Sequence, residues 1–234
     1  DEAPRDTFYP PSGGIYIPRW QNLTSVTNPE YLRGWGVQGA IGRMPVPEGE
    51  PGIAGFMGYG EMLPSYDNRV SLHPRRKDRW GMPIPRIRVE LGPNERALQA
   101  AQVAGLREMA EAASIRVNFA GTSLGLDSPK VWPDADPISR LAFRMFFRRS
   151  LAVGAAIHEC GGARMGADPA TSVLNSHNQA WDVPNLFVTD SACYTSNGAT
   201  GPTLTIMALS ARAAEYIATE HASGSLHTPS AARG

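Results

Sequence analysis

The chain has 234 residues, 42% of them hydrophobic, and its 22 basic and 22 acidic residues give a formal net charge of zero. This composition is typical of a globular protein with a sizeable core, in one large domain or two small ones. Neither charge sign gathers into a long run, which argues against nucleic acid or an anionic membrane as a partner. No apolar stretch approaches the roughly 20 residues of a membrane span. We therefore expect the protein to act on a small molecule.

Alternating apolar and polar residues predict antiparallel strands in the first third of the chain. Residues 14–20, 68–73 and 83–91 show this alternation, and residues 53–63 mix small and apolar side chains. Pro18 cannot donate a backbone hydrogen bond, so the first strand is expected at a sheet edge. The short turn segments between the later strands favour hairpin-like connections.

Residues 34–39 formally match the three-glycine fingerprint of dinucleotide-binding proteins. That motif needs a buried strand before it and a helix after it, because the phosphate binds at the helix N-terminus. Here a polar segment precedes the glycines, and Met44-Pro45-Val46-Pro47 follows them. We therefore reject a dinucleotide site and expect a glycine-rich strand that bends over its neighbour.

Helical periodicity predicts an amphipathic helix over residues 94–114, with Asn94 as a possible cap and Glu95 in its first turn. Its apolar stripe consists of Leu98, Ala101, Gly105, Met109 and Ala112. We expect a further strand at 115–121 and a loop at 122–136, followed by a short helix over a pocket mouth at 137–150. The small, polar tail at 223–234 is expected to be disordered.

A last helix is predicted to begin at Pro202, since proline suits a first helical position and Gly201 before it lets backbone approach a ligand closely. Apolar residues surround the axis of this helix, so we expect it to be buried on most sides. A buried helix N-terminus carries about half a positive charge and favours an anion. A purely structural core helix is equally compatible with this pattern.

Residues 185–190 predict a parallel strand buried on both faces, with Asp190 at the end where open α/β sheets hold ligands. Asp190 can accept hydrogen bonds from cofactor hydroxyls, although an isolated aspartate at this place is more often a turn residue. His158 precedes Gly161-Gly162, which again permits close approach of the backbone. Taken alone, His158 is more often structural than catalytic.

The order of these motifs is more informative than any one of them. It runs from His158 through Gly161-Gly162, Arg164-Met165-Gly166, Ser172-Val173-Leu174-Asn175 and residues 185–190 to Gly201-Pro202-Thr203-Leu204-Thr205 and Ala208-Leu209. This series closely resembles the C-terminal region of the glucose-methanol-choline (GMC) flavoprotein oxidoreductases, nearest to bacterial sugar and gluconate dehydrogenases and pyranose oxidases. Upstream, Gly60-Glu61-Met62-Leu63-Pro64, Asn68-Arg69-Val70 and residues 77–83 are similar to the substrate domain of that branch.

The resemblance implies an α+β fold. Residues 1–150 would form a substrate-binding domain with an antiparallel sheet and helices. Residues 151–222 would supply a C-terminal strand and a buried helix to an FAD-binding α/β domain and would carry the active-site histidine. The N-terminal half of that domain, with its Gly-rich turn, is absent from these residues, so we expect the chain to be a C-terminal portion or one subunit.

The resemblance also implies FAD as cofactor and assigns roles to residues. His158 would take the alcohol proton while hydride leaves for flavin N5, a role that suits an imidazole. Pro202, Thr203 and Leu204 begin the helix, and the amides of the last two would face the flavin C2 carbonyl.

Asp190 and the Ser191 amide would hold the ribityl and diphosphate part of FAD. Gly201 occupies a catalytic position where the family usually has Asn or a second His, so Asn197, Thr200 or a lid residue would have to substitute. The resemblance implies no metal site.

The expected function is FAD-dependent oxidation of an alcohol or sugar hydroxyl. The expected partners are a sugar or polyol and an FAD-binding N-terminal segment or second subunit, and a bacterial cytoplasm and a periplasm both remain open. The two cysteines, Cys160 and Cys193, do not decide the redox compartment.

A non-catalytic carbohydrate-binding protein of the same fold is the alternative, favoured by Gly201 and the absent Gly-rich turn. Hydrolase readings are weak, because His158-Glu159 lacks a second His at metal-ligand spacing and no G-x-S-x-G motif occurs.

Overall fold

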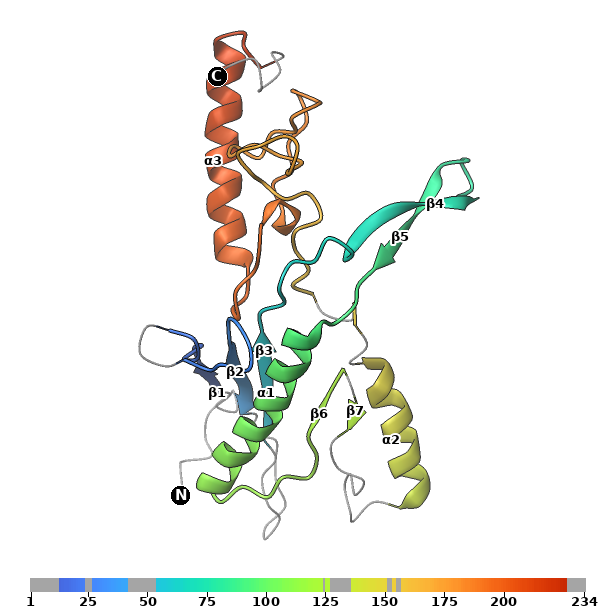
Figure 1. Cartoon of the computed structure of the whole chain (residues 1–234), viewed down its shortest axis with the longest axis vertical. Coiled ribbons are helices and arrows are strands. Elements are labelled where there is room, and N and C mark those ends of the chain that lie inside the picture. Colours follow the sequence, from blue (N-terminus) through green and yellow to red (C-terminus); the bar gives the residue numbers. More distant parts are fainter. Residues whose placement is uncertain are drawn as a thin grey trace, which may run out of the picture. The chain divides into compact units, whose positions relative to one another are not determined.

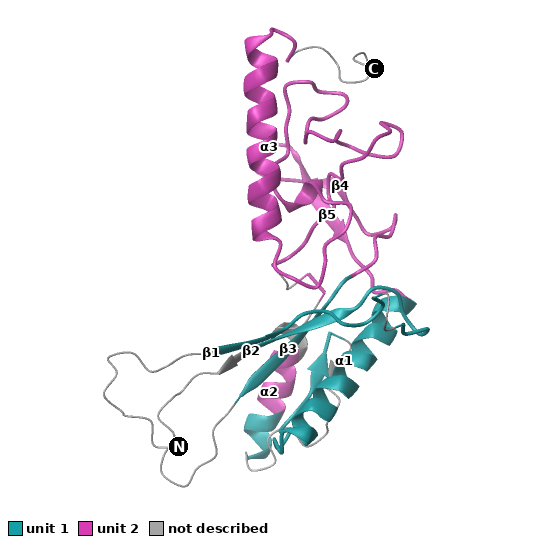
Figure 2. Cartoon of the chain, turned by 90° about the vertical axis from the view of Figure 1, so that its left-hand side faces the viewer, with its two compact units in different colours: residues 1–61, 93–140 teal, residues 62–92, 141–234 magenta. Residues whose placement is uncertain are grey.

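The computed structural model describes residues 13–23, 27–41, 54–123, 125–126, 136–150, 153–154 and 157–226. The chain divides into two compact units (Figure 2), which are described separately below. The first unit comprises residues 1–61 and 93–140, and the second comprises residues 62–92 and 141–234. We predicted a boundary at residue 150, whereas the compact units group residues 62–92 with the C-terminal part. The assignment of a substrate domain and a flavin domain stays a prediction.

An antiparallel sheet forms the centre of the first unit (Figure 1). Its strands are β1 (Gly13–Ile17), β2 (Trp35–Ile41) and β3 (Gly55–Gly60), in that order. The strand predicted at residues 14–20 is confirmed as β1, and it lies at the sheet edge as Pro18 indicated. The glycine-rich segment is the central strand β2, which agrees with the rejection of a dinucleotide site.

Helix α1 (Pro93–Ala112) packs on β3 and covers the core of this unit, confirming the predicted amphipathic helix. The buried core residues are Tyr31, Trp35, Val37 and Leu98. At Gly105 an added Cβ would lie 2.9 Å from the Trp35 ring, so the absence of a side chain lets α1 approach the sheet. Asn94 does not precede the helix as a cap. Proline takes the first helical position, and Asn94 Oδ1 accepts a hydrogen bond from the Leu32 amide at 2.7 Å.

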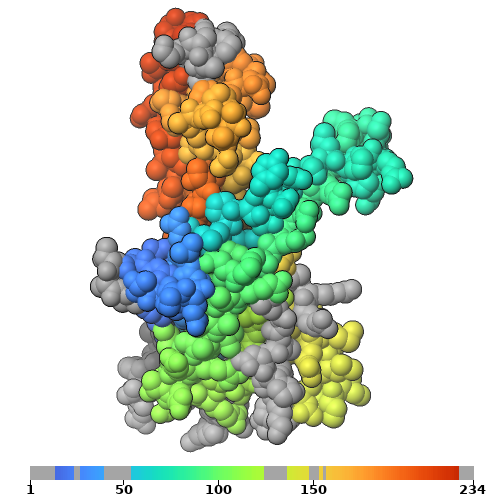
Figure 3. All heavy atoms as spheres, in the orientation of Figure 1, coloured from blue at the N-terminus to red at the C-terminus, as the bar shows by residue number. Residues whose placement is uncertain are grey.

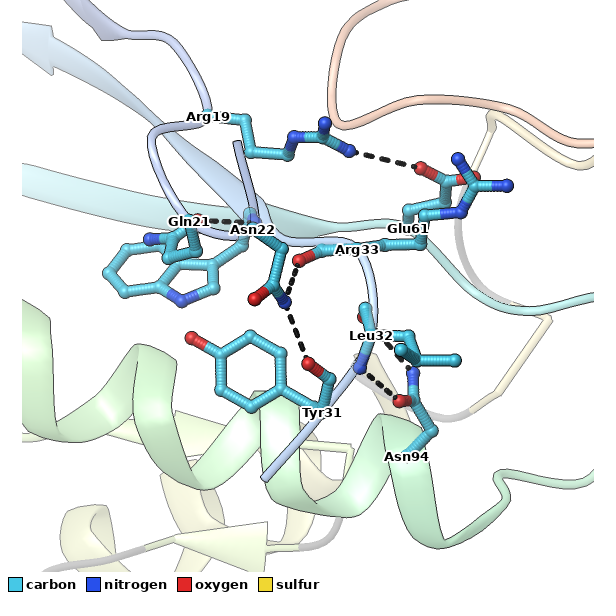
Figure 4. Close-up of polar contacts among 9 residues, drawn as sticks. Arg19, Gln21, Asn22, Tyr31, Leu32, Arg33, Glu61 and Asn94 are labelled. Atoms are coloured by element: carbon cyan, nitrogen blue, oxygen red, sulfur yellow. Dashed lines mark hydrogen bonds and ion pairs between the residues drawn. The ribbon is translucent and has the colours of Figure 1, made fainter. Parts of the chain in front are cut away.

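A buried carboxylate ties the ends of the sheet strands together (Figure 4). Glu61 follows β3, and its side chain is only 4% exposed. Its two oxygens lie 3.7 Å from Arg19 Nη1 and 3.6 Å from Arg33 Nε. The Asn22 side chain donates to the backbone carbonyls of Tyr31 and Arg33, at 2.7 and 2.6 Å. These contacts fix the connection between β1 and β2 against the end of β3.

The strand predicted at residues 115–121 is wrong except at its last residue. Strand β6 is only Gly121–Thr122 and pairs with β7 (Gly125–Leu126). The reason lies at the end of α1, where Ser114 adopts a left-handed φ of 55°. The Ile115 amide then donates back to Ala110 O at 2.8 Å, so it terminates the helix instead of joining a sheet. Most of the loop predicted at 122–136 lies outside the described residues.

In the second unit, the hairpin predicted from residues 68–73 and 83–91 is confirmed. Strands β4 (Arg69–Lys77) and β5 (Pro83–Arg88) pair antiparallel, with Val70 opposite Ile87. In the space-filling view the atoms of the hairpin form a turquoise lobe (Figure 3). Helix α2 (Pro137–Ser150) has the predicted bounds, and its role over a pocket mouth stays a prediction. The fold class is α+β, as expected.

Helix α3 (Thr203–Ala222) confirms the predicted last helix but not its burial. Of its residues only Ala213 is buried, and Leu204 is 80% exposed. One side of α3 packs through Ile206 and Leu209 on a small core that includes Leu174 and Cys193. Its other side is open in the described structure. Of the tail predicted to be disordered, residues 223–226 are instead ordered, with Ser225 N donating to Glu220 O at 3.0 Å, and residues 227–234 lie outside the described residues.

The buried parallel strand predicted at residues 185–190 is also wrong. Phe187 forms a single antiparallel bridge to Gln179, and Leu186 is 48% exposed. The Leu186 amide donates to Val183 O at 2.9 Å, closing a local turn. Ala180 N donates to Leu186 O at 2.9 Å and Val188 N donates to Asn178 O at 3.0 Å, so a turn and a short antiparallel pairing with residues 178–180 satisfy this backbone in place of a buried parallel sheet.

The described helices include none that combines the length and the apolar character needed to cross a membrane. This finding concerns α1, α2 and α3 alone.

The Glu61 cluster generates a stability prediction. Replacing Glu61 by Gln removes the buried charge that pairs with Arg19 and Arg33, and should lower the free energy of unfolding by about 2 kcal/mol. The loss stays moderate because both arginines reach solvent. Glu90→Gln is the control, since Glu90 pairs with Arg88 at 3.1 Å on the surface and should cost below about 1 kcal/mol. Urea denaturation measures both, and equal losses would contradict the role assigned to Glu61.

Candidate active site

The segment that follows His158 is held by backbone hydrogen bonds to the short 3₁₀ helix η1 (Ser191–Cys193). The bonds join Gly161 N to Ser191 O at 3.2 Å, Ala163 N to Ala192 O at 2.9 Å, and Met165 N to Cys193 O at 2.9 Å. The Ser191 hydroxyl also donates to Glu159 O at 2.7 Å. Gly161 has a φ of 85°, which explains the need for glycine there. The position of His158 therefore depends on η1.

The imidazole of His158 lies beside Gly201. A Cβ added to Gly201 would be 3.8 Å from His158 Cε1 and 3.9 Å from Nε2, which are ordinary van der Waals distances. Gly201 is the second residue before α3. The structure thus places His158 near the helix start, in agreement with the expectation that both face the same cofactor.

The start of α3 is held firmly by the carbonyl of Pro202. This carbonyl accepts hydrogen bonds from Ile206 N at 3.0 Å and from Tyr194 Oη at 2.9 Å. Pro202 has helical dihedral angles, φ −80° and ψ −9°, and immediately precedes the first helical residue, Thr203. Thr203 and Leu204 are exposed. First-turn amides have no carbonyl partner within a helix and carry partial positive charge, so they favour an electron-rich group.

Asp190 and Ser191 lie at the beginning of η1 rather than at a strand end. Asp190 Oδ1 accepts a hydrogen bond from Ala192 N at 2.8 Å and so caps η1. The carboxylate is otherwise exposed. The Ser191 hydroxyl is already engaged with Glu159 O, which leaves its amide as the group expected to contact a cofactor. The ligand roles of both residues stay predictions.

A cavity of about 290 Å³ lies against the start of α3. Most of its lining is polar or small: Met165, Tyr194, Thr195, Ser196, Asn197, Gly198, Thr200, Gly201, Pro202, Thr205 and Leu209. Asn197 and Thr200, the residues named as substitutes for the missing side chain at position 201, both line it. His158 lies at Gly201 and is not part of the lining itself.

Tyr194 is a lining residue that the sequence analysis missed. It is buried, and desolvation by burial raises the pKa of its phenol, so the hydroxyl is a hydrogen-bond donor at neutral pH. Burial likewise raises the pKa of the neighbouring Cys193 thiol. The only sequence feature that could have indicated Tyr194 is that an aromatic residue lies between the predicted ligand Asp190 and the predicted helix start.

Among the described residues, no three His, Cys, Asp or Glu side chains gather in a way that would hold a metal ion.

Comparison with known proteins adds an independent observation. Residues 64–210 match the family model described as GMC oxidoreductase. A 2-methyl-1,2-propanediol dehydrogenase of Mycolicibacterium austroafricanum is 36% identical over 160 residues, covering 68% of this chain and 24% of that protein.

Two further relatives are more distant in sequence. A gluconate 2-dehydrogenase flavoprotein of Pantoea cypripedii is 27% identical over 150 residues, covering 64% of this chain and 21% of its own length. A C-glycoside 3-oxidase of Arthrobacter globiformis is 28% identical over 192 residues, covering 80% of this chain and 32% of its own length. The match therefore spans a third or less of each of these relatives. Because the family model covers more than half of the residues, the chain belongs to the GMC oxidoreductase family.

Proposed function

We propose that this chain is the C-terminal portion, or one subunit, of an FAD-dependent enzyme that oxidises an alcohol or sugar hydroxyl. The observation that carries the proposal is the position of the His158 imidazole beside Gly201, at the start of α3. Membership of the GMC oxidoreductase family agrees with it. So do the relatives, which are named as dehydrogenases and oxidases of diols, sugars or glycosides.

The residues at the helix start fit a flavin ring. Thr203 and Leu204 are exposed in the first turn, so their amides can meet an electron-rich carbonyl. When bound, FAD would accept the hydride that leaves the substrate carbon. Thr203 and Leu204 would then stabilise negative charge through the helix N-terminus, and Asp190 with the Ser191 amide would bind the ribityl and diphosphate part.

His158 is the proposed general base. Its ring is partly buried and lies at the edge of the helix start, where a substrate hydroxyl can lie between the imidazole and the cofactor. A neutral imidazole accepts the hydroxyl proton as the carbon–hydrogen bond breaks, and it returns the proton to solvent afterwards. The backbone bonds between residues 161–165 and η1 keep the ring at this place.

The proposed substrate class is a sugar or polyol. The cavity offers hydroxyl and amide side chains at Thr195, Ser196, Asn197 and Thr200, which can bond several hydroxyl groups of one molecule. A purely apolar alcohol would leave these groups without partners. Asn197 and Thr200 are the proposed substitutes for the side chain that Gly201 lacks.

The proposed macromolecular partner is an FAD-binding segment or subunit that covers the open side of α3. Leu204 and Met207 expose apolar surface on that side, 80% and 63% respectively. Such large exposed apolar side chains are typical of a surface that another polypeptide covers. The covering piece would also supply the remaining contacts to FAD.

A second candidate is a carbohydrate-binding protein without redox activity. Gly201 favours it, since no side chain at this position can hydrogen-bond a substrate hydroxyl. The visible absorption of a flavin in purified protein distinguishes the two candidates. A flavin band that bleaches when a sugar or polyol is added without oxygen supports the oxidoreductase. Sugar binding by a protein that stays colourless even with the FAD-binding segment or subunit present supports the alternative.

Replacing His158 by Ala should slow reduction of the bound flavin by about 100- to 10,000-fold, because the proton then has no base at the site. Stopped-flow absorbance of the flavin-loaded protein measures this rate. His221→Ala is the control, since His221 lies exposed in the last turn of α3. The general-base role is wrong if the two variants reduce flavin at the wild-type rate.

Replacing Gly201 by Asn should increase kcat/KM for the sugar or polyol substrate by roughly three- to tenfold, because the amide adds one hydrogen bond to the reacting hydroxyl. The added Cβ meets only ordinary contacts with the His158 ring, so the side chain fits. Gly198→Asn is the matched control, since Gly198 lines the same cavity and an added Cβ there contacts only Thr200, at 4.0 Å. An unchanged or lower kcat/KM in the Gly201 variant would contradict the idea that position 201 limits turnover.

A further inference from the structure

We propose that Tyr194 is a positioning residue, whose hydroxyl fixes the start of α3 against η1 and thereby sets how tightly the helix amides hold the flavin. The inference rests on the proposed function, because it concerns the same site. It adds a residue to which neither the motifs nor the family membership assigned a role.

The geometry shows one side chain that connects two separate elements. The backbone of Tyr194 closes η1, with its amide donating to Ser191 O at 3.2 Å. Its phenol reaches across and donates to Pro202 O at 2.9 Å. Tyr194 is 6% exposed and Pro202 is buried, so water does not compete well for this bond.

The phenol links the two ends of a loop that contains two glycines. Eight positions separate Tyr194 from Pro202 along the chain, and Gly198 and Gly201 lie between them. Glycine allows more backbone conformations than any other residue, so this loop alone does not define where α3 begins. The hydrogen bond from Tyr194 Oη to Pro202 O joins the two ends of the loop directly. Since burial raises the pKa of the phenol, the donor proton is retained across the neutral range.

The position of the helix start matters for two groups at once. The amides of Thr203 and Leu204 belong to the first turn, and stabilisation by prearranged donors depends on their distance from the developing charge. His158 lies beside Gly201, at the end of the same loop. Loss of the hydrogen bond to the Pro202 carbonyl would therefore change both the contact of the helix amides with the flavin and the surroundings of the His158 ring.

The test uses Tyr194→Phe in the flavin-loaded protein, with Tyr216→Phe as the matched control. Tyr216 lies on α3 as well, and its hydroxyl is 3.5 Å from Gln179 Oε1, away from the helix start. We expect Tyr194→Phe to weaken FAD binding about fivefold and to shift the flavin reduction potential to a more negative value. Tyr216→Phe should leave both unchanged. Fluorescence titration with FAD and a redox titration give these readouts.

A second variant separates positioning from general stability. Gly201 does not have a left-handed φ and has room for a Cβ, so Gly201→Ala stiffens the loop without strain. Added to Tyr194→Phe, it should recover part of the lost FAD affinity, and it remains informative if the single variant folds poorly. If Tyr194→Phe keeps the wild-type FAD affinity and flavin reduction potential, the inference is wrong. It is also wrong if the double variant recovers no FAD affinity. In both cases the proposed function is unaffected. If the wild-type chain together with its FAD-binding segment or subunit binds no FAD, the proposed function is wrong together with the inference.

Discussion

The backbone pairing between residues 161–165 and η1 is the constraint on which the rest of the site depends. It brings two chain segments separated by about thirty positions into register, and the Ser191 hydroxyl extends the pairing to Glu159 O. Beneath it lies a small core that contains Leu174 and Cys193, both fully buried. Since α3 packs on this same core, the core positions both the segment that follows His158 and the start of the helix. Neither could be positioned by local structure alone.

Local patterns were sufficient wherever an element depends mainly on its own residues. The alternation at 14–20, the helical periodicity at 94–114 and the apolar, basic composition of 137–150 predicted elements close to β1, α1 and α2. They failed where the outcome depends on what lies next to the segment. The run Leu186-Phe187-Val188 has strand composition, but its backbone closes a turn to Val183 and pairs with residues 178–180 in an isolated antiparallel bridge. Likewise the helix end at Ser114 removed the Ile115 amide from any sheet.

The sequence predicted the residues of the candidate site and the closeness of His158 to the helix start, but not the contacts that hold them there. The order of the motifs singled out His158 and the helix start, because glycines and proline at fixed places restrict the backbone in recognisable ways. Tyr194 gives no such signal. Its contribution depends on the conformation of the glycine-containing loop that follows it, and that conformation is set by burial and by one side-chain hydrogen bond. The division into compact units likewise depends on contacts between distant segments, since it groups residues 62–92 with segments far along the chain.

The exposure of α3 explains why the chemistry proposed here needs additional polypeptide. A helix N-terminus stabilises negative charge strongly only where water is excluded, because solvent screens its partial charge. In the described structure Thr203 and Leu204 face solvent and α3 buries only Ala213. The match to the 2-methyl-1,2-propanediol dehydrogenase covers 24% of that relative, so most of the relative's length lies beyond it. A second polypeptide segment over the helix start would raise the field of the amides and exclude water from His158 at the same time. The same polypeptide segment would therefore both cover α3 and complete the proposed catalytic site.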